Sequence, residues 1–177
     1  MAHLKRLLAS KHFPISRKKN TFTISPSPGP HGKRECIPLA VLLKEGLKLA
    51  EGSREAKKVI AAGELMVDGR IRRNHKHPVG LMDVVQIPKI KKSFRVIARE
   101  GRLKLVGIGE DKASWKLCKV KDKTVTKGKK VQVNLHDGRN IIVGKDDYKT
   151  GDSLMLSLPD QKIMDHFRLE KGAGTPG

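Results

Sequence analysis

The chain has 177 residues, and its 38 lysines and arginines against 18 aspartates and glutamates give a formal net charge of +20. This length suits one ordinary domain or two small ones, and it is enough to bury a core. No apolar run is long enough to cross a membrane, and the basic start lacks the features of a secretory signal. Cys36 and Cys118 show no pairing pattern and fit a reducing compartment. A cationic excess of this size favours a polyanionic partner, with nucleic acid first and anionic lipid second.

Residues 1–34 form a basic segment with eight cations and no acid. Because like charges repel one another and few apolar residues are present, we expect an extended arm that becomes ordered when phosphates neutralise it. A solvated tail that only keeps the protein soluble is the alternative. The end of the segment, residues 25–32, is rich in proline and glycine and is typical of a rigid connector.

Two helices are predicted after the connector. Apolar residues recur from Leu39 to Ala50 at helical spacing, which predicts a helix of about three turns that begins near Pro38. A second helix is predicted over 54–62, with Ser53 as its N-cap and Gly63 ending it. This second helix separates its apolar residues (Ala56, Val59, Ile60) from its cations (Arg54, Lys57, Lys58). Three cations on one face are typical of a helix that contacts phosphates, and a solvated surface is the alternative.

A hairpin is predicted next. Residues 65–73 contain two short apolar runs around Asp68-Gly69, the strongest short-range hairpin signal. Arg70 and Arg72 share a face of the second strand, because strands have a period of two. A further strand is predicted over 83–87. Residues 35–92 are therefore predicted to form one α+β domain, with two helices and a small antiparallel sheet.

The rest of the chain is predicted to be all β. Short strand-like runs follow one another between turn residues: 94–97, 103–106, 116–120, 131–135, 141–143, 154–158 and 163–167. Asp137-Gly138 is a second hairpin signal. We expect residues 93–171 to form a small β domain of the barrel or sandwich type, followed by a flexible tail over 172–177.

Catalytic and metal-binding patterns are weak. Gly107 and Gly109 begin a dinucleotide fingerprint, but Lys112 stands where the third glycine is needed. The pair His75 and His77 has no accompanying CxxC or HExxH pattern, so a solvated or RNA-facing loop is favoured over a metal site. We therefore expect no catalytic residue, no metal and no cofactor.

The aromatic content points to a mode of nucleic-acid binding. Only 3% of the residues are aromatic, too few for a base-stacking platform, and no recognition helix, zinc finger or basic zipper is evident. This composition favours binding to the phosphates and shape of structured RNA. A membrane-surface role needs large apolar residues opposite the cations, and the Ser/Pro/Gly-rich stretch offers none.

Residues 52–70, GSREAKKVIAAGELMVDGR, resemble the alpha-L RNA-binding motif, a helix pair followed by a hairpin. The flanks narrow the resemblance: HLKR at 3–6, GPHGKRECIPL at 29–39, PVGLMDV at 78–84, WKLCKV at 115–120 and DHF at 165–167. With these segments, the chain is identified as a member of the eukaryotic and archaeal type of the small-subunit ribosomal protein four family. The short arm favours an archaeal member.

The resemblance implies a non-catalytic structural protein of the small ribosomal subunit, located on cytoplasmic ribosomes. Its implied partners are ribosomal RNA and other small-subunit proteins, with no membrane, no small-molecule substrate and no homo-oligomer. The residues expected to contact RNA are Lys5, Arg6, Lys11, His12, Arg17, Lys18, Lys19, His31, Lys33, Arg34, Arg54, Lys57, Lys58, Arg70, Arg72 and Arg73. Family members usually continue past the position of Lys171 into a KOW-type β domain, which this sequence does not include.

The alternative function is a ribosome-associated or RNA-modification factor that carries the same motif. Pseudouridine synthases with this motif place a long catalytic domain after it. Residues 93–177 are too short for such a domain and have different strand content. The sequence therefore favours the structural protein.

Overall fold

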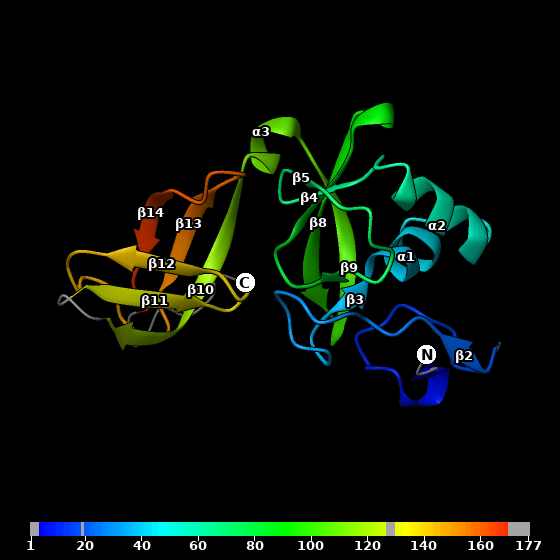
Figure 1. The fold of residues 1–177 in the computed structure, drawn as a ribbon, viewed down its shortest axis with the longest axis horizontal. Coiled ribbons are helices and arrows are strands. Elements are labelled where there is room, and N and C mark those ends of the chain that lie inside the picture. The colour runs from blue at the N-terminus through cyan, green and yellow to red at the C-terminus, as the bar shows by residue number, and fades with distance from the viewer. Residues whose placement is uncertain (1–3, 19, 127–129, 170–177) are drawn as a thin grey trace. The chain divides into compact units, whose positions relative to one another are not determined.

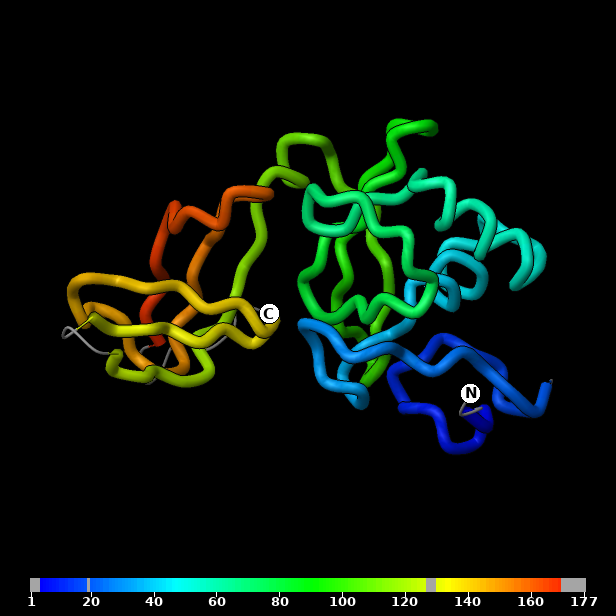
Figure 2. Tube along the Cα trace, in the orientation of Figure 1, coloured from blue at the N-terminus to red at the C-terminus, as the bar shows by residue number. Residues whose placement is uncertain are grey.

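The computed structural model describes residues 4–18, 20–126 and 130–169, and the chain divides into two compact units, 1–114 and 115–177 (Figures 1 and 2). The predicted tail, 172–177, lies outside the described residues. Mixed α and β structure with antiparallel sheets agrees with the predicted α+β class.

The N-terminal segment is folded onto the first unit instead of standing away from it. Strand β1 (Leu4–Lys5) pairs with β2 (Phe22–Thr23), and a 3-10 turn, η1 (Arg6–Leu8), follows β1. Ala9 and Phe13 are 5% and 4% exposed and belong to the main core. This differs from the extended arm that the sequence predicts, because Leu4, Ile15 and Ile24 also pack against the core and anchor a segment whose charge suggests exposure to solvent.

The first predicted helix is shorter than its apolar stripe. Helix α1 (Leu39–Val41) continues as a π-helical turn, η2 (Leu42–Gly46), and ends there. Gly46 lies so close to strand β9 (Arg102–Ile108) that a Cβ would be 3.2 Å from Leu105 Cδ1. Lys48 then adopts a left-handed conformation with φ of 54°. The chain therefore turns after Gly46, and Ala50 reaches the core from a non-helical segment.

Helix α2 (Ser53–Ala61) matches the second predicted helix, but its cap differs. Ser53 is the first helical residue and Gly52 occupies the N-cap position. The Glu55 carboxylate instead accepts a hydrogen bond of 2.8 Å from the Glu51 backbone N–H. Gly63 ends the helix with φ of +80°, as predicted. Within the described ranges, no helix has the length and apolar character that crossing a membrane requires.

The main sheet of the first unit has five antiparallel strands in the order β5-β4-β7-β8-β9. These are β4 (Met66–Val67), β5 (Arg70–Ile71), β7 (Val84–Ile87), β8 (Lys92–Arg99) and β9 (Arg102–Ile108), with a short helix, η3 (Pro88–Ile90), between β7 and β8. The predicted Asp68-Gly69 turn joins β4 to β5. A separate pair is formed by β3 (Ile37–Pro38) and β6 (Pro78–Val79).

The predicted domain boundary at residues 92 and 93 was wrong. Strand β8 pairs with β7 along four residue pairs, so the sheet continues across that point. The first unit ends only after helix α3 (Glu110–Ala113). The physical reason is that β7 has an open edge after pairing with β4, and β8 satisfies its backbone groups.

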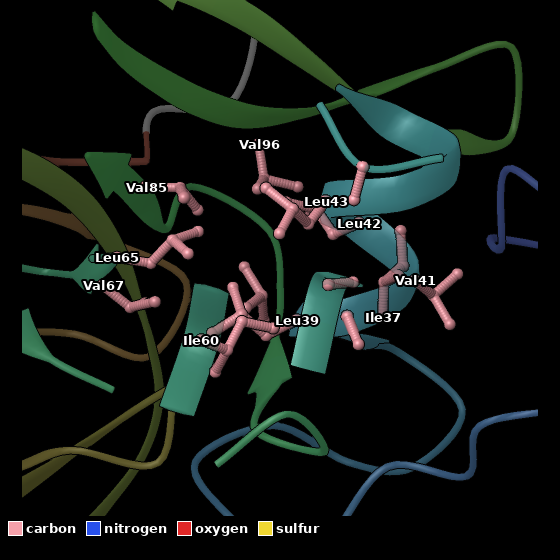
Figure 3. Packing of buried hydrophobic residues seen from close by; sticks show 14 of the residues in the cluster. Ile37, Leu39, Val41, Leu42, Leu43, Ile60, Leu65, Val67, Val85 and Val96 are labelled. Atoms are coloured by element: carbon pink, nitrogen blue, oxygen red, sulfur yellow. The ribbon is translucent and has the colours of Figure 1, made fainter. Parts of the chain in front are cut away.

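The core of the first unit lies between the helices and this sheet. Figure 3 shows Leu39, Leu42 and Leu43 pointing toward Ile60 of α2 and Val96 of β8. These five side chains are all at most 2% exposed. The packing fixes the orientation of α2 and leaves its opposite face to solvent.

The second unit is one five-stranded antiparallel sheet with the order β12-β11-β10-β13-β14. Its strands are β10 (Trp115–Val125), β11 (Val131–Leu135), β12 (Asn140–Val143), β13 (Ser153–Ser157) and β14 (Ile163–Phe167). The first half of β10 pairs with β13 and the second half with β11, with a bulge between Val120 and Asp122. The predicted strands are confirmed. The predicted barrel or sandwich is corrected to one sheet over one small core, because β12 and β14 remain at its two edges in the described residues.

Candidate nucleic-acid interface

Helix α2 presents a cationic face, as its sequence predicted. Ala56 and Ile60 are completely buried. On the other side of the helix Arg54, Lys57 and Lys58 are exposed. Because residues three and four positions apart share a helix face, burial of the apolar stripe holds these three cations toward solvent.

The β4–β5 hairpin brings further arginines next to this helix. Arg70 and Arg73 are exposed and Arg72 is half-buried. Gly63 joins the two elements closely, since a Cβ at this position would lie 3.3 Å from Nε of Arg73. We call the combined cations of α2, of β5 and of the two residues after β5 the helix–hairpin surface: Arg54, Lys57, Lys58, Arg70, Arg72 and Arg73.

The two histidines of the adjoining loop have pKa values that are lowered by burial and by neighbouring cations. Partial burial lowers the pKa of His75, and the charges of Lys57 and Lys76 lower it further. Burial, followed by the charge of Arg72, lowers the pKa of His77 to about 4. Surrounding cations also disfavour a metal ion at this histidine pair. The loop therefore lies within the same positive field as the helix–hairpin surface.

The remaining predicted RNA-contact residues fall into three groups. Exposed are Lys5, Lys11, Lys18, Lys33 and Arg34; half-buried are His12 and Arg17; buried are Arg6 and His31. Lys19 lies outside the described residues. The Arg17 guanidinium donates hydrogen bonds to the carbonyls of Leu7 and Ala9, at 3.1 and 3.2 Å, so it stabilises the η1 turn.

Arg6 ties segments of the arm to one another and to η2, whereas its RNA contact stays a prediction. Its guanidinium donates to the Ser16 carbonyl at 2.8 Å and to the Phe22 carbonyl at 3.3 Å. It also pairs with the Glu45 carboxylate at 3.3 Å. With 6% of the residue exposed and three hydrogen bonds to protein oxygens, Arg6 is directed mainly into the protein.

His31 is likewise held by contacts within the protein, and its RNA contact stays a prediction. Its Nε2 lies 2.8 Å from Oδ2 of Asp83, and both side chains are buried. The Gly80 backbone N–H donates to the same carboxylate oxygen at 2.9 Å. A Cβ at Gly80 would lie only 2.3 Å from the His31 ring, so glycine is required for this approach. The contact fastens the connector to the β6–β7 loop.

Several cations that are exposed or half-buried were missed by the sequence reasoning. Lys76 lies near His75, and Lys91, Lys92 and Arg102 lie on turns or strand ends of the main sheet. Eleven cations against five acids in residues 61–110 are the signal that pointed to them. The charge count locates the excess but does not show which side chains reach the surface.

The second unit contains a buried charged cluster that resembles a metal site only in composition. Ligand atoms of Cys118, His136 and Asp137 lie within 4.8 Å of one another. However, Oδ2 of Asp137 is 2.6 Å from Lys116 Nζ and 3.2 Å from Arg139 Nε. Burial, followed by the Asp137 charge, raises the pKa of the Cys118 thiol. Two cations already neutralise the carboxylate and the thiol stays protonated, so the cluster does not fit a metal ion.

Comparisons with known proteins agree on one family. The family model "Ribosomal family S4e" matches residues 90–163, and the "RS4NT (NUC023) domain" model matches residues 2–34. The small ribosomal subunit protein eS4 of Archaeoglobus fulgidus is 48% identical over 171 residues, which are 97% of this chain and 72% of that protein. The protein of the same name from Methanosphaera stadtmanae is 50% identical over 172 residues, 97% of this chain and 71% of that protein.

A solved structure is also similar. The crystal structure of the 30S ribosomal protein S4e from Thermoplasma acidophilum matches with a TM-score of 0.69 at 36% identity. The match covers 78% of this chain and 71% of that chain. The sequence resemblance to the archaeal type of this family is thus confirmed, and the chain belongs to the S4e family of ribosomal proteins.

Proposed function

We propose that this chain is a structural constituent of the small ribosomal subunit and binds ribosomal RNA through phosphate and shape contacts. Family membership supports this proposal, since the similar proteins are named as small-subunit ribosomal proteins. The observation that carries the RNA-binding part is the helix–hairpin surface. Within the described ranges, none of its six cations forms an ion pair with an acidic side chain.

The chemistry of this surface suits an RNA backbone. Phosphate oxygens accept hydrogen bonds from guanidinium and ammonium groups, and arginine binds them in a bidentate fork. The nearby Glu55 carboxylate accepts a hydrogen bond from the Glu51 N–H at the start of α2. Each lysine or arginine that contacts a phosphate releases about one counterion, so binding is expected to weaken steeply with salt.

The exposed arm cations extend the proposed contact. Lys5, Lys11, Lys18, Lys33 and Arg34 are exposed, and His12 and Arg17 keep part of their surface free. The proposed motif, an alpha-L type RNA-binding domain, would then use its helix–hairpin surface together with this folded arm. We infer further that its partners are other small-subunit proteins as well as RNA, that it works on cytoplasmic ribosomes as a monomer, and that it catalyses no reaction.

The proposal is tested by sedimentation of a tagged copy expressed in its own kind of cell, followed by a high-salt wash. We expect the chain to remain on small subunits at one copy per particle. Association that is substoichiometric and removed by salt would contradict a structural role and favour a transient ribosome-associated factor. A parallel test for pseudouridine formation by the purified chain distinguishes the RNA-modification alternative.

A further inference from the structure

A groove lies between the folded arm and the turn that joins β8 to β9. The arm contributes Leu8, Lys11 and His12, the connector contributes Pro26 with Lys33 and Arg34, and Gly101 of the turn completes the lining. Its volume is about 780 Å³, within the range of about 300–1,000 Å³ usual for small-molecule sites. A nucleotide, unlike a duplex, is small enough to enter such a groove.

The groove combines an apolar floor with a cationic rim. Ala9 and Phe13 line its floor and are anchored in the main core. Leu8 is 75% exposed, which leaves a large apolar side chain beside the cations. Lys11, Lys33 and Arg34 are exposed at the rim, and no carboxylate is found among the described lining residues. An apolar surface suits the face of a base, whereas the rim suits the phosphates on either side of it.

Hydrogen bonds fix the shape of the groove in advance. The Ser10 hydroxyl donates to the Arg34 carbonyl at 2.7 Å, which ties the connector to the arm. His12 Nδ1 lies 3.2 Å from the Gly101 carbonyl oxygen. Because a carbonyl oxygen only accepts, Nδ1 carries the proton in this contact, and Nε2 is left to contact a base. A preformed site loses less conformational entropy on binding.

We propose that this groove holds one unpaired RNA nucleotide, with its base against Leu8 and His12 and its flanking phosphates on Lys11, Lys33 and Arg34. The inference rests on the proposed function and adds to it, because phosphate and shape contacts alone do not distinguish a paired from an unpaired base. Paired bases are stacked inside the A-form helix and cannot reach the groove floor. The chain would therefore recognise a bulged or looped position within its RNA.

The test uses the full chain and three hairpin RNAs of equal charge at physiological salt. One hairpin is fully paired, one carries a single bulged nucleotide, and one carries an abasic bulge. We expect the bulged RNA to bind about tenfold more tightly than the other two, which corresponds to one stacked base. The abasic RNA separates a contact to the base from the greater flexibility of a bulged backbone.

Variants locate the preference in the groove. Leu8→Ser is expected to bring the bulged RNA down to the affinity of the paired one, and His12→Ala to remove the preference as well. Leu7→Ser is the matched control, since Leu7 is also an exposed leucine, at 69%, but does not line the groove. It should keep all three affinities unchanged. Thermal unfolding of each variant checks that the arm remains folded.

The outcomes separate this inference from the proposed function. If the three RNAs bind tightly and equally to the wild-type chain, the groove inference is wrong and the proposed function stands. If none of the three binds, both are wrong. A preference for the bulged RNA that survives Leu8→Ser and His12→Ala would also overturn the groove inference. So would loss of that preference when polyglutamate of equal charge is added as a competitor. In the latter case the groove accepts any anion, including an acidic protein segment.

Discussion

The buried pair of Lys116 and Asp137 offers a sharp test of the energetics of the second unit. Lys116 is fully buried, and its Nζ lies 2.6 Å from Oδ2 of Asp137, which is 1% exposed. Asp137 also pairs with Arg139 and accepts a hydrogen bond from the Cys118 thiol at 3.4 Å. Asp137→Ala therefore removes the carboxylate that pairs with a buried ammonium group. Loss of one partner of a buried pair costs about 3–5 kcal/mol of unfolding free energy.

The reverse deletion should cost less. Lys116→Met leaves a chain of similar length in the core, while Asp137 keeps Arg139 Nε at 3.2 Å and the Arg139 backbone N–H at 3.2 Å. What is lost is one hydrogen bond to a charged group, about 1.5–3 kcal/mol. We therefore expect Asp137→Ala to destabilise the unit more than Lys116→Met. Asp147→Ala, at an exposed carboxylate of the same unit, is the control and should stay within about 0.5 kcal/mol.

Urea denaturation followed by tryptophan fluorescence measures these differences. Trp115 is the one tryptophan of the chain and begins β10, directly before Lys116, so its signal reports on the second unit. If Asp137→Ala and Lys116→Met each cost less than about 1 kcal/mol, the pair behaves like a surface ion pair and the reasoning is refuted. If Lys116→Met costs more than Asp137→Ala, the carboxylate is not the more important partner of the pair.

Three further predictions concern the first unit. Replacing the three α2 cations with glutamate should abolish RNA binding without lowering the melting temperature. Replacing Lys121, Lys145 and Lys162 of the second unit with glutamate is the control and should weaken binding far less. Equal losses of affinity would mean that net charge alone determines binding. Gly80→Ala places a Cβ 2.3 Å from the His31 ring and should expose the connector to trypsin. Gly107→Ala is the control, because its Cβ meets nothing within 4 Å. Equal cleavage rates would contradict the role of the His31–Asp83 contact in holding the connector. His77 has a pKa of about 4 against an ordinary 6.5, so its unfolded form binds a proton more readily, and the first unit should lose stability as the pH falls from 6.5 to 4. His77→Asn should flatten that part of the melting-temperature profile, and an unchanged slope would show that other groups cause it.

The local elements could be predicted from the sequence because their signals are local. The Asp68-Gly69 turn, the end of α2 at Gly63 and the two faces of α2 each depend on residues within a few positions of one another. The cationic face of α2 was found for the same reason. The helix before it was predicted too long, because its apolar stripe continues past Gly46 whereas the helical conformation of the backbone ends there.

Contacts between distant parts of the chain could not be predicted at the site. Arg6 and His31 look like free cations of a basic arm, but their acidic partners are 39 and 52 residues away. No spacing rule links such pairs. The domain boundary failed similarly, because the pairing of β7 with β8 extends a sheet that the sequence pattern ends at residue 92. The groove was not predicted because its lining comes from three separate segments.

The contacts that fasten the arm also have a consequence for the order of folding. The contacts Arg6–Glu45, His31–Asp83 and His12–Gly101 close loops of 39, 52 and 89 residues. Contacts this distant form after local helices and hairpins, because loop closure costs entropy. Synthesis at about 5–20 residues per second separates His31 from Asp83 by roughly 3–10 s. A growing chain therefore presents its cationic first segment undocked, and the part that is made first becomes the last part of this unit to fold.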